Sequence, residues 1–302
     1  MFSYRHAFHA GNHADVLKHA VLVHLLDHLN LKETPYTVVD THAGAGLYDL
    51  GGEWAQKKAE YAEGVALLHE ATRKDSESPL PALVTRYLQA VAECNPPGEL
   101  KYYPGSPWLV LQALRDSDKL RLYEMHPAEF EILRRVLSDR VRERPRQIQI
   151  KQSNGFDGIR AQLPPASRRG LIIIDPSYED KHDYGRVVQS LGEGIQRFAT
   201  GCYAVWYPLV QRREVQQLIR SLEKLPVSWL NASLTVCRPA RDGHGLHGSG
   251  MFVINPPWTL KASLEEALPW LVQTLGRDER AQHTLSVAPA EKTQTKRSLS
   301  RK

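Results

Sequence analysis

The chain opens with apolar positions at helical spacing, followed by a short strand pattern. Between residues 13 and 30 apolar side chains recur every three to four positions, which predicts an amphipathic helix. Residues 32–35, Lys-Glu-Thr-Pro, end this pattern, because proline cannot continue a helix. Residues 36–40 are β-branched and apolar and predict a strand that runs into a glycine-bearing turn at 41–46.

The next segment, residues 51–95, shows helical patterns without a strand, and a Pro/Gly-rich joint at 95–98 closes it. We interpret it as an inserted helical subdomain. Residues 1–50 and 96–288 then form the main domain, and the polar, basic residues 289–302 are predicted to be a disordered tail.

Beyond the joint, strand and helix patterns alternate. Strands are expected at 119–123, 147–151, 171–174, 201–207, 229–236 and 250–254, and helices near 107–116, 127–139, 184–198 and 210–224. The run 171–174, Leu-Ile-Ile-Ile, is typical of a central parallel strand buried on both faces. The alternation predicts an α/β fold with a doubly wound sheet, whose ligands bind at the carboxyl ends of the strands.

Composition narrows the class of protein. Of 302 residues, 42% are hydrophobic and 24% charged, as in a globular protein, and no apolar run is long enough to span a membrane. The N-terminus lacks a secretory pattern, and Cys94, Cys202 and Cys237 lie far apart without a C-x-x-C pair, so we expect a cytoplasmic protein. The net charge of +5 and several arginine clusters favour a polyanionic partner, although solvated helix faces explain any single cluster equally well.

Two strand ends carry candidate ligand-binding residues. Asp40 precedes the turn that contains Gly44 and Gly46, and glycines there let the backbone approach a ligand closely. Glu124 ends the next strand of the resumed alternation, where a carboxylate can accept hydrogen bonds from both ribose hydroxyls. Alone, each is compatible with an ordinary turn or a surface acid; in this order, they favour a nucleoside ligand.

A third strand end carries candidate chemistry, Asp175-Pro176-Ser177-Tyr178, one residue away from the Asp/Asn-Pro-Pro-aromatic pattern of amino-methylating enzymes. An exocyclic amine is a poor nucleophile because its lone pair is delocalised into the ring. Hydrogen bonds to the Asp175 carboxylate and the Pro176 carbonyl would localise that lone pair, and the Tyr178 ring would stack on the base.

A second motif, Asn255-Pro256-Pro257-Trp258, fits the same pattern better. We nevertheless assign catalysis to Asp175, because the acceptor turn should follow the fourth strand, beside the glycine loop. Asn255 comes three strand candidates later, and we expect its prolines to end a strand and direct Trp258 into packing.

Seven segments of the chain are informative when taken together: YRHAFHAGNHADVLKH, DTHAGAG, YYPGSP, the segment 124–127, SRRGLIIIDPSYE, RFATGCYAVWYP and GMFVINPPW. Together they resemble the large-subunit (23S) ribosomal RNA adenine-N6 methyltransferase J family over residues 1–288. The resemblance implies a class I S-adenosylmethionine-dependent methyltransferase fold with a helical insertion. It also implies methylation of the N6 amine of one adenine in 23S rRNA, with a preference for naked RNA.

The resemblance further implies site residues. Contacts to S-adenosylmethionine would come from His19, His42, Ser106, Glu124, Asn154, Gly155 and Asp175. Asp175 would also accept a proton, and Tyr4 would touch the RNA. Two positions depart from expectation: Asn154 stands where an Asp is expected and cannot supply a charge, and Ser177 replaces a proline, which should loosen the turn.

Several alternatives stay open. His9 and His13 could share a helical face as metal ligands, but no neighbouring acid completes a set and the chemistry needs no metal, so none is expected. The same turn chemistry would serve DNA adenine or a protein glutamine amide, and a non-catalytic nucleic-acid-binding protein could keep the fold. We expect a monomer without an obligate protein partner.

Overall fold

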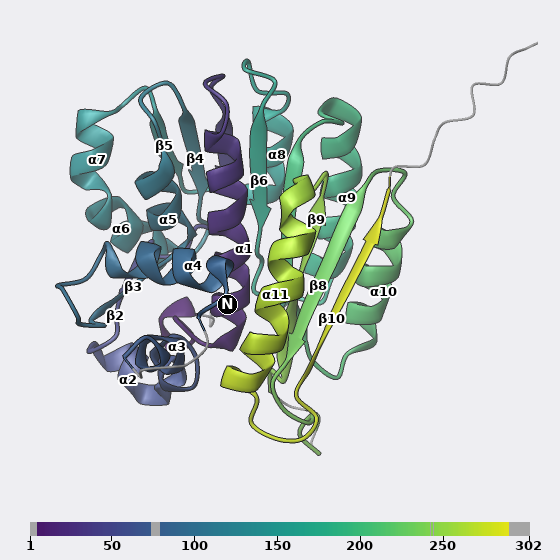
Figure 1. The fold of residues 1–302 in the computed structure, drawn as a ribbon. Coiled ribbons are helices and arrows are strands. Elements are labelled where there is room, and N and C mark those ends of the chain that lie inside the picture. Colours follow the sequence, from purple (N-terminus) through teal and green to yellow (C-terminus); the bar gives the residue numbers. More distant parts are fainter. Residues whose placement is uncertain (1–4, 74–78, 242, 244, 290–302) are drawn as a thin grey trace, which may run out of the picture.

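A computed structural model describes residues 5–73, 79–241, 243 and 245–289. An eight-stranded sheet runs through this part of the chain in the order β10-β8-β9-β7-β6-β1-β4-β5, and β2 and β3 pair separately (Figure 1). The strands are β1 (Thr37–Asp40), β2 (Leu47–Asp49), β3 (Tyr102–Pro104), β4 (Lys119–Tyr123), β5 (Ile148–Lys151), β6 (Gly170–Ile174), β7 (Cys202–Leu209), β8 (Trp229–Thr235), β9 (Gly248–Ile254) and β10 (Gln282–Ala288).

Strand direction divides the sheet in two. From β5 to β7 neighbouring strands are parallel, whereas β9 is antiparallel to both β7 and β8, and β10 is antiparallel to β8. Helical elements connect them: η1 (His6–Phe8), α1 (His13–Asn30), α2 (Glu53–Lys58), η2 (Glu60–Glu63), α3 (Val65–Ala71), α4 (Ala82–Ala92), α5 (Ser106–Ala113), α6 (Pro127–Val136), α7 (Ser138–Glu143), α8 (Gly155–Gln162), α9 (His182–Arg197), α10 (Arg213–Glu223) and α11 (Trp258–Leu275). This arrangement confirms the predicted doubly wound α/β fold.

The central strand β6 shows why the sheet is buried on both faces. Its side chains alternate between two hydrophobic clusters: Leu171 and Ile173 belong to the one that contains α1, α4, α5 and α11 residues. Ile172 and Ile174 belong to the other, which contains α8, α9 and α10 residues. Because successive side chains of a strand point to opposite faces, an unbroken apolar run is what a strand with helices on both sides requires.

Helix α1 corrects one prediction. It was expected to be amphipathic, but its first eleven residues, His13–Val23, are all buried, polar ones included. The reason lies in tertiary structure: α1 lies across one face of the sheet, beside α11, and contacts β9, β7, α4 and α5 (Figure 1). A helix covered on several sides needs partners for its polar side chains, and these partners turn out to form part of the site.

The described residues of the predicted insertion form the helical elements α2, η2, α3 and α4, joined by turns, and no strand. The antiparallel pair β2–β3 joins the two chain segments that flank it. Its apolar side chains, among them Val65, Leu68, Val84 and Tyr87, belong to the same hydrophobic cluster as α1. The insertion therefore shares the core of the main sheet. The domain boundaries given above stay a prediction.

Three strands were missed, and so were the helices α8 and α11. β2 and β3 are three residues each, β10 has only three apolar residues in an exposed edge strand, and α8 is only eight residues long. α11 carries an internal proline, Pro269, that obscures its pattern. The predicted tail, 289–302, lies outside the described residues apart from residue 289. Within the described ranges, no helix is both long and apolar enough to cross a membrane.

Candidate functional site

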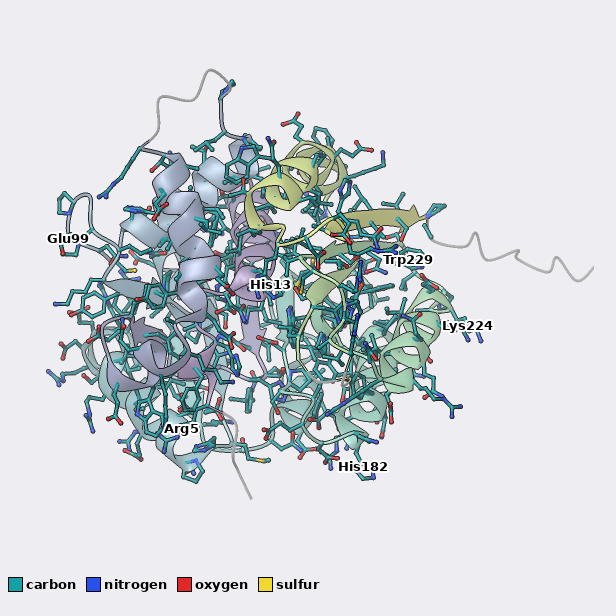
Figure 2. All side chains as sticks on the ribbon, turned by 90° about the horizontal axis from the view of Figure 1, so that it is seen from below. Arg5, His13, Glu99, His182, Lys224 and Trp229 are labelled. Atoms are coloured by element: carbon teal, nitrogen blue, oxygen red, sulfur yellow. The ribbon has the colours of Figure 1, made fainter. Side chains whose placement is uncertain are left out.

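A cleft of about 1250 Å³ opens where the parallel strands end. Figure 2 looks at the molecule from this side, with His13 near the middle of the view and Arg5 and His182 toward the rim. The cleft is lined by the predicted site residues His19, His42, Ser106, Glu124, Asn154, Gly155, Asp175, Pro176 and Tyr178. The fold thus brings together side chains that span more than half of the sequence. Tyr4 lies outside the described residues.

The first strand end is built around a buried carboxyl group. Asp40 is fully buried; its carboxylate accepts hydrogen bonds from the Ser106 hydroxyl at 2.6 Å and from the His42 N–H at 3.2 Å. Burial raises the pKa of Asp40 to about 7, although both hydrogen bonds oppose that shift. Ser106 therefore holds Asp40 in place at the base of the glycine loop. Gly44 follows with φ +60°, a conformation that favours glycine.

Glu124 ties the second strand end to the first. Its carboxylate accepts from the Gly44 N–H at 2.8 Å and from the His126 N–H at 2.7 Å, one bond to each oxygen. Burial raises its pKa, and the two backbone donors oppose the shift. Each carboxylate oxygen has a second acceptor position, so Glu124 can hold the glycine loop and still accept from the two hydroxyls of a ribose.

The start of α8, which follows β5, lies at very close range to the residue after β1, Thr41. A Cβ atom at Gly155 would lie 1.9 Å from the Thr41 carbonyl oxygen, so only glycine lets α8 begin there. Asn154 caps α8, its Oδ1 accepting from the Phe156 N–H at 3.0 Å. The side-chain oxygen of this expected cofactor contact thus already accepts a hydrogen bond from the helix, which leaves its second lone pair for a ligand.

Two buried histidines on the cleft wall are neutral. Burial lowers the pKa of His42 to about 4 and the pKa of His19 well below its usual value. The Nδ1 of His19 lies 2.7 Å from the Tyr103 hydroxyl, whereas its buried Nε2 has no partner among the described residues. An unsatisfied buried nitrogen is costly, so a ligand that reaches it gains a hydrogen bond.

These residues fit an S-adenosyl cofactor. Glu124 can bind a ribose, the glycine loop and the start of α8 leave backbone exposed, and the orphaned His19 Nε2 offers a polar contact.

A buried ion-pair network, not predicted from the sequence, holds the candidate catalytic residue. The Lys18 ammonium donates to the Asp175 carboxylate at 2.6 Å and lies 2.8 Å from the Asp15 carboxylate. Asp15 also lies 2.8 Å from the His6 ring. Burial alone would lower the pKa of Lys18, but the two carboxylates outweigh it and raise that pKa. Lys18 is therefore charged at every physiological pH and orients Asp175, whose side chain is 17% exposed to the cleft.

The turn after Asp175 adopts a strained conformation. Tyr178 has φ +54°, which is unfavourable for a bulky residue. Its hydroxyl donates to the Trp206 carbonyl at 2.8 Å, and its own carbonyl accepts from the Arg212 guanidinium at 2.9 Å. The Tyr178 ring, expected to stack on a base, is 2% exposed and packs against Tyr184 and Trp206. Base stacking on it would require this turn to open.

The competing motif lies at the opposite edge of the sheet. β9 is antiparallel to β7, so Asn255, at its carboxyl end, follows Ile254, which pairs with Tyr203 at the start of β7. The Asn255 amide donates to the Ala199 and Gly201 carbonyls at 2.8 and 2.7 Å. The prediction that Trp258 packs is wrong: its side chain is 85% exposed, because α11 begins at this residue and points it outward.

Of the two histidines that suggested a metal, His9 has another partner. His9 Nδ1 lies 2.9 Å from the Glu60 carboxylate, and burial lowers the pKa of His13 to about 4. In the described part of the chain, no three His, Cys, Asp or Glu side chains gather as metal ligands would.

Comparisons with known proteins agree with this geometry. A family model described as "Ribosomal RNA large subunit methyltransferase D, RlmJ" matches residues 33–287. The chain is 44% identical over 271 residues to ribosomal RNA large subunit methyltransferase J of Escherichia coli K12, covering 90% of this chain and 93% of that protein. It is 44% identical over 276 residues to the protein of the same name from Haemophilus influenzae, covering 91% and 94%.

Among solved structures, a Legionella pneumophila protein superimposes with a TM-score of 0.80 at 32% identity, over 94% of this chain and 99% of that one. The fold, the cleft and the sequence matches therefore agree, and the chain belongs to the ribosomal RNA large subunit methyltransferase RlmJ family.

Proposed function

We propose that this protein transfers a methyl group from S-adenosylmethionine to the exocyclic N6 amine of one adenine in 23S rRNA, acting on naked RNA. One observation carries the proposal: Asp175, held by Lys18, lines the same cleft as Glu124 and the glycine loop. A group that can orient an amine thus lies beside residues that can hold a nucleoside cofactor. The names of the two relatives described above support a large-subunit rRNA substrate.

In this proposal the cofactor is held by His19, His42, Ser106, Glu124, Asn154, Gly155 and Asp175. Glu124 accepts from the ribose, and His19 satisfies its orphaned Nε2 on the ligand. When bound, S-adenosylmethionine would supply an electrophilic methyl carbon attached to a sulfonium sulfur, and the remainder of the cofactor would be the leaving group, a neutral thioether.

Asp175 and Pro176 act on the amine. The Asp175 carboxylate and the Pro176 carbonyl accept hydrogen bonds from the N6 group, which localises the nitrogen lone pair and aims it. The amine loses one proton during or after transfer, and Asp175 is placed to accept it. Lys18 keeps a positive charge 2.6 Å from that carboxylate, so Asp175 starts each turnover in a fixed orientation. Catalysis is then mainly a matter of position.

The adenine must leave its stack to reach this cleft, because a paired base hides its N6 amine. We assign an RNA contact to Tyr4, at the N-terminal end of the segment that leads to η1. We also propose that the main domain comprises residues 1–50 and 96–288, with the helical insertion between them. The protein would be a monomer without an obligate protein partner. An rRNA substrate also places the reaction in the cytoplasm.

The test is methylation in parallel of unmodified 23S rRNA transcript, adenine-containing DNA and a glutamine-containing protein, followed by mass-spectrometric mapping. A single N6-methyladenosine in the transcript is expected. Methylation of DNA or protein but not of the transcript would assign another substrate, and binding of S-adenosylmethionine without any methylation would favour a non-catalytic role.

A further inference from the structure

Beside the cleft, η1 and α2 together form a cluster of aromatic and basic side chains. Its members are Arg5, Phe8, Trp54, Lys57 and Lys58, which we call the aromatic–basic platform. The Phe8 and Trp54 rings meet edge to face with their centroids 5.1 Å apart. The Arg5 guanidinium lies 4.7 Å from the Trp54 ring centroid, and the Lys57 ammonium lies 5.8 Å from it. The Lys58 ammonium lies 5.8 Å from the Phe8 ring centroid.

The platform is accessible and positively charged. The Trp54 side chain is 41% exposed, although a tryptophan usually packs into a core. Among the described residues, neither Arg5 nor Lys57 has a carboxylate within 4 Å, and Lys58 has only Glu60, at 3.9 Å. Glu60 is itself engaged by His9 at 2.9 Å and Asn12 at 3.0 Å. The platform therefore offers three cations with little local neutralisation.

The platform is continuous with the cleft. Lys58 and His6, from the same two elements, line the cleft wall. Arg5 lies on the same side of the molecule, in the view that faces the carboxyl ends of the strands (Figure 2). A nucleotide strand whose adenine enters the cleft would thus pass the platform within a few nucleotides.

We propose that the platform binds the single-stranded RNA that flanks the target adenine, a base stacking on Trp54 while Arg5, Lys57 and Lys58 bind phosphates. This inference rests on the proposed RNA substrate. Aromatic rings combined with cations are the means by which proteins hold unpaired strands, because every base has a face to stack and every linkage a phosphate. Lys57 and Lys58 are exposed and Arg5 is partly exposed, so all three cations are accessible to a phosphate.

The chain contains a matched control. Trp258 is 85% exposed at the start of α11, on the opposite edge of the sheet, and no described cation lies over its ring. Lys261, one turn along α11, pairs with Glu265 at 2.6 Å. An exposed tryptophan and an exposed lysine are therefore available far from the cleft.

The experiment measures binding of the full-length protein to unmodified 23S rRNA transcript across a range of salt concentrations. Trp54→Ala should weaken RNA binding about fivefold or more, and Trp54→Phe should restore most of it. Lys57→Gln should lower the slope of log affinity against log salt by about 0.7, the value for one single-strand phosphate contact. Trp258→Ala and Lys261→Gln should change neither quantity, and calorimetric binding of S-adenosylmethionine should be equal in all variants.

The outcomes separate this inference from the proposed function. If the wild type methylates the transcript while Trp54→Ala and Lys57→Gln bind it as well as the two controls, the platform is not an RNA surface and the proposed function stands. If the wild type neither binds nor methylates the transcript, both the proposed function and the proposed role of the platform are overturned. If Trp54→Ala also loses cofactor binding, its fold is damaged, and the salt slope of Lys57→Gln decides alone.

Discussion

Nearly the same four-residue motif occurs at both ends of the sheet's strands, but the two copies have different surroundings. At the edge where the parallel strands end, Asp175 faces a cleft, pairs with a buried lysine and leads into a strained turn. At the other end, the Asn255 amide donates hydrogen bonds to two backbone carbonyls, and Trp258 is exposed to solvent. The motif can take part in a reaction only at the end of the sheet where ligand-binding residues also lie. Strand direction decides at which end the motif is placed.

The largest expected effect separates the two motifs directly. Asp175→Ala should reduce methylation of 23S rRNA transcript by about 10³-fold or more while the protein stays folded, because the amine loses its acceptor. Asn255→Ala should retain most activity but lower the free energy of unfolding by about 1–3 kcal/mol. It loses three side-chain hydrogen bonds, and alanine is strained at φ +51°.

Single-turnover methyl transfer and thermal unfolding of both variants measure this contrast. A folded, inactive Asn255→Ala protein beside an active Asp175→Ala protein would reverse the assignment.

The second prediction contrasts two lysines. Lys18→Met should lower turnover by about 100-fold and the free energy of unfolding by roughly 3 kcal/mol, because Asp15 and Asp175 would share a buried site without a cation. Lys261→Met, which removes an exposed pair at the other edge, should cost at most about 0.5 kcal/mol. Denaturant titration and turnover below the unfolding range test both. Equal losses in the two variants would argue against a role for the buried network.

The third prediction concerns the cofactor cradle. Glu124→Ala should weaken S-adenosylmethionine binding about 10- to 100-fold, because the ribose loses its acceptor and the Gly44 and His126 N–H groups lose theirs. Glu131→Ala, an exposed acid on α6, is the control. Calorimetry gives both affinities. Unchanged affinity in Glu124→Ala would exclude the ribose contact.

The smallest expected effect concerns the turn itself. Arg212→Gln should lower turnover about fivefold, because the Tyr178 carbonyl loses a charged donor that helps to hold the strained turn. Ser177→Pro in the same chain should restore part of that loss by stiffening the turn, since the Ser177 N–H donates to no described group. Arg213→Gln is the neighbouring control.

Turnover of the single and double variants is the measurement. A double variant no faster than Arg212→Gln would mean that Arg212 does not act through the turn.

Much of the fold could be predicted because its signals are local. The apolar run of β6 and the glycine turn after β1 follow from strand and turn chemistry within a few residues. The order of Asp40, Glu124, Asn154 and Asp175 at successive strand ends placed them at one edge, and the cleft contains three of the four beside Ser106, which holds the fourth.

What escaped prediction depended on distant partners. In the sequence, Lys18 is one polar position on a predicted helix. It pairs with Asp175, 157 residues later, only because the fold packs α1 against the end of β6. The burial of α1 and the packing of Tyr178 likewise depend on neighbours that no local pattern reveals.

The sequence by itself therefore determined the element types, the strand-end residues and the family. Only the tertiary structure decided that Asn255 faces away from the cleft, that Trp258 is exposed while Tyr178 is buried, and that Asp175 is paired. The physical reason is that hydrogen-bonding propensity and hydrophobic period act over one element. Strand direction, burial of charge and ion pairing are properties of elements packed against one another.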